Sequence, residues 1–132
     1  MLTLVCRHLA HRRWAYAVAA SAILVWLSSI PIRQPGNIPY LDKVEHVGAY
    51  FLLALAYYNV GSSGGRRIGR AVALGTWLAA VAFGISDEWH QSFVPGRSED
   101  VADVVADAIG AALGIRAALA MRNGFVRRAG SG

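Results

Sequence analysis

Four apolar runs, each long enough for a helix, alternate with short polar or helix-breaking segments along this chain. They cover residues 14–30, 44–60, 71–89 and 101–121. Runs of about 17 to 25 mostly apolar residues suit helices that cross a bilayer. Pro31 closes the first run, a Gly-Ser segment at 61–65 closes the second, and Pro95 and Gly96 precede the fourth. The pattern predicts an all-α fold, an integral membrane bundle of four transmembrane helices in a single domain over residues 1–132.

Composition supports a membrane protein and argues against a soluble or nucleic-acid-binding one. The chain is 55% hydrophobic and 16% charged, with a mean hydropathy of +0.39. Its net charge of +5 comes from basic clusters beside apolar runs, which is how membrane helices are oriented. We therefore expect no nucleic-acid partner, and we expect both termini on the cytoplasmic side. In a four-span arrangement that side holds Arg7, Arg12, Arg13, Arg66, Arg67, Arg70, Arg116, Arg122, Arg127 and Arg128.

Two aspartates, Asp103 and Asp107, lie inside the last apolar run and are four residues apart. Residues at this spacing share one face of a helix. An aspartate within a membrane costs about 2.5–3.5 kcal/mol on insertion scales and is tolerated where it faces a bundle interior or water. A matched pair therefore indicates a functional polar site. We expect burial to raise the pKa of Asp107 and to keep it neutral, and the alternative is a charged Asp107 paired with Arg97 or Lys43.

Other polar residues converge on the same, outer side of the four-span arrangement. We expect one shared chamber near the outer leaflet, formed by Asp42, Lys43, His46, Asp87, Glu88, Gln91, Arg97, Asp103 and Asp107. Asp42 has an alternative interpretation as a helix N-cap. His90 is less favoured as a chamber residue, because it follows Glu88 by two positions and its side chain therefore points to another face of the helix. Gly110 and Gly114 have the spacing of close helix packing.

His46 and His90, together with the carboxylates, are of the residue types that bind zinc or another divalent cation. No dense ligand motif such as H-E-x-x-H occurs. We therefore expect neither a metal nor a cofactor, and the divalent-cation site stands as the less favoured alternative.

The linked blocks Asp42-Lys43-Val44-Glu45-His46 and Asp87-Glu88-Trp89-His90-Gln91, with the following Arg97, resemble the VanZ-like family. This resemblance implies a small bacterial integral membrane protein, placed in the cytoplasmic (inner) membrane with several spans. The family is named for a member associated with resistance to teicoplanin-type glycopeptides. Many members carry Asn where this chain has Asp107. The residues that carry over are Asp42, Lys43, His46, Asp87, Glu88, Gln91, Arg97, Asp103 and Asp107.

Two functions fit these residues. The favoured one is a cell-envelope accessory protein that binds membrane lipids through a head group, or a lipid-linked envelope precursor, with a link to glycopeptide resistance. The alternative is a membrane-embedded enzyme acting on a polyprenyl phosphate or another lipid by acid/base chemistry. The catalytic candidates are His46, Asp87, Glu88, Asp103 and Asp107, and the substrate-binding candidates are Asp42, Lys43, Gln91 and Arg97.

Overall fold

The computed structural model describes residues 2–31, 40–62 and 70–129, with side chains in 11–31, 40–62 and 70–123. Its helices are α1 (Leu2–Ser28), α2 (Leu41–Gly61), α3 (Arg70–Gln91) and α4 (Val101–Ala129), and these ranges contain no strand. The predicted all-α chain of four helices is therefore confirmed. The expected loop at 34–39, the turn residues 63–65, and Arg33, Arg66 and Arg67 lie outside the described residues.

The helix ends differ from the apolar runs for local reasons. α1 begins well before position 14, because residues 2–13 contain no glycine or proline to stop a helix. α4 begins at Val101 as predicted, where Asp100 Oδ1 accepts the N–H of Ala102 at 2.8 Å and caps the helix. α2 begins at Leu41, and its N-cap is Tyr40. The N-cap interpretation of Asp42 is therefore wrong.

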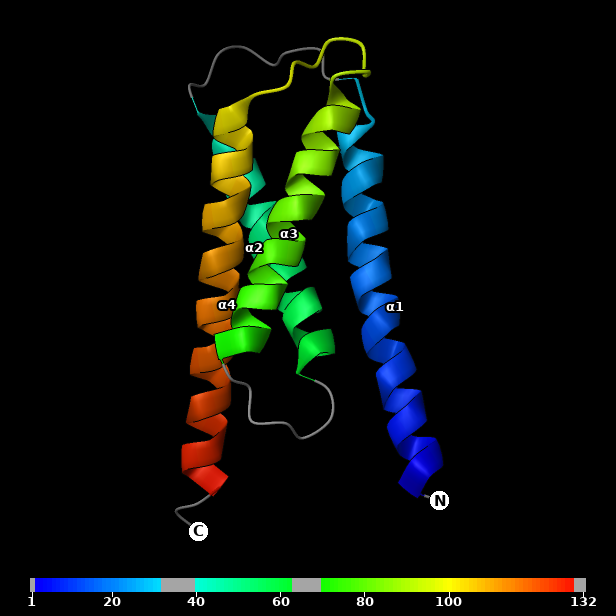
Figure 1. Ribbon diagram of the computed structural model, residues 1–132, viewed down its shortest axis with the longest axis vertical. Helices are drawn as coiled ribbons and strands as arrows, with labels where there is room; N and C mark the ends of the chain where they lie inside the picture. The colour runs from blue at the N-terminus through cyan, green and yellow to red at the C-terminus, as the bar shows by residue number, and fades with distance from the viewer. Residues whose placement is uncertain (1, 32–39, 63–69, 130–132) are drawn as a thin grey trace.

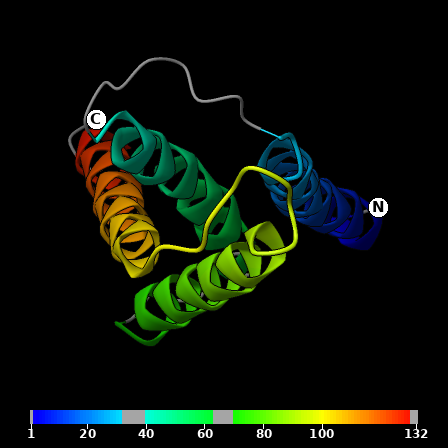
Figure 2. The ribbon, with the colours of Figure 1, turned by 90° about the horizontal axis from the view of Figure 1, so that it is seen from above.

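The helices run alternately up and down. α2, α3 and α4 form a close group, and α1 leans against α2 and α3 at one side (Figure 2). α1 diverges from the group towards its beginning, and the start of α1 and the end of α4 lie at the same end of the bundle (Figure 1). At the opposite end, which we call the polar end, α1 and α3 finish while α2 and α4 begin.

The closest helix pair is α2 and α4, and two glycines permit its approach. A Cβ at Gly110 would overlap the carbonyl oxygen of Val47, and a Cβ at Gly114 would overlap that of Phe51. The predicted close packing at Gly110 and Gly114 is therefore confirmed. This contact fixes the register in which the first turns of α2 meet the first turns of α4.

Polar side chains are buried at the polar end, while large apolar side chains cover the outside. Asp87, Glu88, Gln91, Asp103 and Asp107 are all at most 6% exposed. Large apolar residues exposed on the four helices include Trp26, Leu52, Leu78 and Ile109. Within the described residues, Arg70–Gln91 and Val101–Asn123 are long and apolar enough to cross a membrane, two helices rather than the expected four. α2 falls short because its first turns carry charged and polar residues.

Candidate functional site

A lysine at the start of α2 gathers three carboxylates at the polar end. Lys43 Nζ donates to Asp42 Oδ2 at 2.9 Å and to Asp100 Oδ2 at 2.7 Å, and it lies 2.6 Å from Asp103 Oδ1. Hydrogen bonds from Lys43 and from the N–H of Ala102 hold the pKa of Asp100 below its ordinary value. Lys43 is thus the cation that ties the start of α2 to the start of α4.

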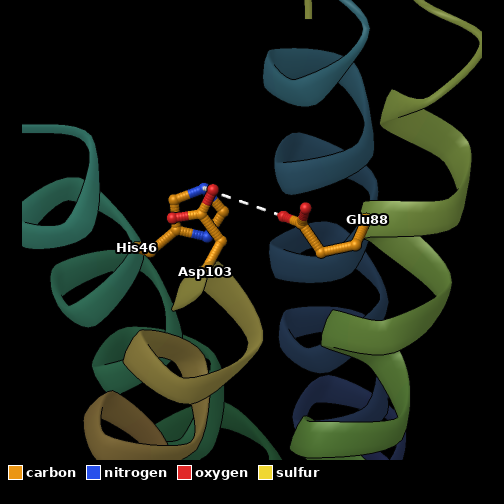
Figure 3. Close-up of side chains that lie close together, drawn as sticks. All are labelled: His46, Glu88 and Asp103. Atoms are coloured by element: carbon orange, nitrogen blue, oxygen red, sulfur yellow. Dashed lines mark ion pairs between the residues drawn. The ribbon is translucent and has the colours of Figure 1, made fainter. Parts of the chain in front are cut away.

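One turn further along α2, a histidine lies among three buried carboxylates. His46 Nδ1 is 2.8 Å from Asp107 Oδ1, while its Nε2 is 3.9 Å from Asp103 Oδ2 and 4.0 Å from Glu88 Oε1. Figure 3 shows the side chains of His46, Glu88 and Asp103 converging from α2, α3 and α4. We call His46, Glu88, Asp103 and Asp107 the histidine cluster.

The carboxylate oxygens of the histidine cluster differ in their hydrogen-bond partners. Glu88 Oε2 accepts the N–H of Asp100 at 3.0 Å, whereas Glu88 Oε1 has no hydrogen-bond partner among the described residues. Asp107 is 1% exposed, and its Oδ2 faces Gly84, where an added Cβ would lie 2.6 Å away. Gly84 therefore makes room on α3 for the Asp107 carboxylate.

A second network links α1 to the end of α3. Asp87 Oδ1 accepts a hydrogen bond from Ser28 Oγ at 2.7 Å, and Asp87 Oδ2 accepts one from Gln91 Nε2 at 3.1 Å. Gln91 Oε1 accepts one from Arg97 Nη1 at 3.0 Å. Arg97 also donates to the backbone carbonyls of Leu27 and Ile30, at 3.2 and 3.3 Å. This chain of bonds holds the end of α1 against α3.

The residues expected in one chamber form two networks, and a single cavity borders on both, through His46 of the first and through Asp87, Gln91 and Arg97 of the second. Asp87 and Glu88 are consecutive, and consecutive helical residues point about 100° apart, so one faces α1 and the other faces α2 and α4. Arg97 belongs with Asp87, and neither Arg97 nor Lys43 is the partner of Asp107. The alternative in which Asp107 pairs with one of these cations is wrong, since His46 occupies that place.

Three further residues lie at or near the polar end: His90, which the sequence disfavoured, and Ser28 and Tyr50, which it did not predict. His90 is excluded from the histidine cluster, because its Nε2 lies 2.9 Å from Ser29 Oγ at an exposed position. Sequence reasoning missed Ser28, although a serine pair closing an apolar run was a visible signal. It also missed Tyr50, which is 2% exposed and whose ring stacks near His46 at 6.4 Å between centroids.

Two cavities follow α1 in succession. The larger, of about 1170 Å³, is an almost wholly apolar groove between α1, α2 and α3, lined by residues such as Trp14, Val25, Tyr57, Gly75 and Phe83. The smaller, of about 420 Å³, lies at the polar end. Its wall on α1 is mainly apolar, and its other lining residues are Glu45, His46, Ala49, Tyr50, Asp87, Gln91 and Arg97.

Comparison with known proteins identifies a relative and a family by sequence. A fission yeast protein, Schizosaccharomyces pombe "uncharacterized protein C11E3.10", is 34% identical over 95 residues. The aligned part is 72% of this chain and 53% of the yeast protein, so the chain spans about half the length of that relative. No solved structure matches. The model of the VanZ/LLP1 family matches residues 8–122, a stretch that contains both networks of the polar end, and the chain therefore belongs to the VanZ/LLP1 family.

Proposed function

We propose that this chain is a four-span membrane protein that binds a membrane lipid, with the lipid tail in the apolar groove and its head group in the polar cavity. The observation that carries the proposal is the succession of the two cavities along α1. The groove uses α1 residues from Trp14 to Trp26, and the polar cavity uses residues from Leu24 to Ile30. An apolar groove followed by a polar cavity matches the shape and polarity of a lipid, with its apolar tail and polar head group.

The distribution of side chains supports four spans. Buried charges with an exposed apolar surface are the reverse of a soluble bundle, and they fit a protein whose outside faces lipid. α1 and α2 contribute to that surface through Trp26 and Leu52, which are both 64% exposed. Lys43 and His46 of α2 face the buried carboxylates, so the polar first turns of α2 are compatible with a span inside a bundle. We place both termini in the cytoplasm of a bacterial cell, with the polar end at the outer leaflet.

Arg97 is the residue best suited to contact an anionic head group. A guanidinium has five N–H donors, and three of those of Arg97 are used by Gln91, Leu27 and Ile30. Two donors face no hydrogen-bond acceptor among the described residues, and Arg97 lines the polar cavity. Lys43 has a different role, because three carboxylates already surround it. The ligand class is a phospholipid or a lipid-linked envelope precursor.

Mass spectrometry of lipid that stays bound through purification in mild detergent tests this proposal. Gly75 lines the groove, and a side chain added there meets open space, so Gly75→Phe should fill the groove without distorting the fold. Gly48 also has open space around its Cβ and does not line the groove, which makes Gly48→Phe the matched control. We expect retained lipid in the wild type and in Gly48→Phe, and a loss of at least fivefold in Gly75→Phe. Equal retention in all three proteins would refute the groove as the binding site.

A membrane-embedded enzyme is the second candidate, favoured by the 2.8 Å contact of His46 with Asp107. A buried carboxylate that orients an imidazole is a recurrent acid/base arrangement. Here Nε2 would transfer the proton, next to the polar cavity that His46 lines. Incubation of the purified protein with a polyprenyl phosphate, followed by mass spectrometry of the products, tests this candidate. Turnover that disappears in His46→Gln supports it, and no turnover refutes it for this substrate.

A further inference from the structure

We propose that the histidine cluster binds a divalent transition-metal ion, through His46 Nε2, Glu88 Oε1 and Asp103 Oδ2. These side chains come from three different helices, and each offers one ligand atom within 4.8 Å of those of the other two. The inference does not depend on lipid binding, because Glu88 and Asp103 line neither cavity, although His46 also lines the polar one. It also differs from the acid/base candidate, since an Nε2 lone pair that binds a metal cannot accept a proton.

The distances between the ligand atoms suit a small ion once the side chains move slightly closer together. The Nε2 atom of His46 is 3.9 Å from Asp103 Oδ2 and 4.0 Å from Glu88 Oε1. Metal–ligand bonds of about 2.0–2.2 Å with tetrahedral angles place neighbouring ligand atoms about 3.4 Å apart. Each of the two separations therefore needs to shorten by about 0.5 Å, which small side-chain rotations can supply.

An unsatisfied oxygen points into the centre of the cluster. Glu88 is 5% exposed, and its Oε1 has no hydrogen-bond donor among the described residues. Leaving a buried carboxylate oxygen without a partner is costly. Since Oε1 faces His46 Nε2, a cation held between them satisfies it. This oxygen is the second, independent indication of a ligand beyond the grouping of acidic residues.

Each of the three ligand side chains is held by its other polar atom. Asp107 lies 2.8 Å from Nδ1 of His46, Lys43 lies 2.6 Å from Oδ1 of Asp103, and the N–H of Asp100 donates to Oε2 of Glu88 at 3.0 Å. When Asp107 is ionised it can only accept, so Nδ1 carries the hydrogen and Nε2 presents its lone pair to the centre. A carboxylate that orients a histidine ligand in this way is the usual outer support of a metal site.

Charge balance favours an ion of charge +2. With a neutral imidazole, the three carboxylates of the histidine cluster carry three negative charges when ionised. Lys43 contacts only Asp103 among them, and it also pairs with Asp42 and Asp100. A divalent cation therefore offsets most of the negative charge buried around His46. One imidazole nitrogen and two carboxylate oxygens suit Zn²⁺ best, and Mn²⁺ next. Three protein ligands leave a position for water or a ligand group, as in catalytic zinc sites.

Metal content of the untagged full chain in mild detergent tests this inference. The protein is stripped with EDTA, reloaded with ZnCl₂, dialysed and measured by inductively coupled plasma mass spectrometry. We expect about one Zn²⁺ per wild-type chain and at least a tenfold weaker affinity in Glu88→Gln. The matched control is Glu99→Gln, which removes the same charge at an exposed loop position and should bind like the wild type.

Two further measurements keep the test decisive if Glu88→Gln does not fold. Asp107→Asn keeps all three ligands but alters the support of His46, and it should weaken Zn²⁺ binding by about 10–100-fold. Wild-type protein loaded with MnCl₂ should show a bound Mn²⁺ signal in electron paramagnetic resonance, which ZnCl₂ displaces. Wild-type protein that retains neither ion, or Zn²⁺ binding that is unchanged in both variants, would overturn the inference.

Discussion

Replacing Gly110 by alanine should separate α2 from α4 and so disturb the histidine cluster. The new Cβ would lie 2.9 Å from Val47 Cα and closer still to the Val47 carbonyl oxygen. Both are backbone atoms, so no side-chain rotation relieves the overlap and the helices must move apart. Overpacking of this kind costs about 1–3 kcal/mol. His46 directly precedes Val47, and hence its contact with Asp107 should lengthen as the helices separate.

The size of this effect can be isolated with a matched glycine. Alanine in place of a helical glycine gains about 1 kcal/mol from helix propensity alone. At Gly48 a Cβ meets nothing within 4 Å, so Gly48→Ala should show that gain without a clash. We therefore expect Gly110→Ala to be less stable than Gly48→Ala by about 1–3 kcal/mol. Unfolding by sodium dodecyl sulfate in mixed micelles, followed by circular dichroism, measures the difference. A Gly110→Ala protein as stable as Gly48→Ala would refute the close α2–α4 contact.

Three more predictions concern the two networks of the polar end. Ser28→Ala removes a 2.7 Å hydrogen bond to buried Asp87 and should lower the free energy of unfolding by about 1–3 kcal/mol, measured in the same assay; no loss would mean that Asp87 does not hold α1. Lys43→Gln leaves Asp103 buried without its cation and should cost about 3 kcal/mol, while an unchanged stability would contradict the ion-pair network. Asp100→Asn should destabilise the protein at pH 7, and the effect should shrink as the pH falls from the ordinary pKa of Asp100 through its lowered folded-state pKa, because the stabilisation is complete only above the ordinary value. A destabilisation that stays the same size down to about pH 1 would contradict the ion pair with Lys43.

Local signals in the sequence were enough to predict the helices and most residues of the polar end. The start of α4 at Val101 follows from the breakers Pro95 and Gly96 and from the capping Asp100. The start of α1 was misplaced because the prediction followed apolar residues, whereas a helix continues through charged residues until a breaker ends it. Spacing along one helix therefore predicted which residues share a face.

The partners of these residues depend on the packing between helices, which spacing does not specify. His46 meets Asp107 because Gly110 and Gly114 set the register of α4 against α2, and the sequence does not state which helix those glycines contact. Arg97 was expected near Asp107, but the loop before α4 directs it to the end of α1 instead. No apolar pattern could have indicated that backbone carbonyls of α1 would be its acceptors.

The central claim, that a lipid occupies the groove beside α1, is tested most directly by photo-crosslinking. A benzoylphenylalanine replaces Trp26, which lines the groove, or Trp89, which is about equally exposed and lines neither cavity. Each protein is solubilised and exchanged into lipid-free detergent before illumination. Exchange removes loosely associated lipid, so only a lipid held in a site can still react. We predict one lipid adduct at position 26 and none at position 89 in the intact-mass spectrum. Adducts at both positions in equal amount, or none at position 26, would contradict the claim.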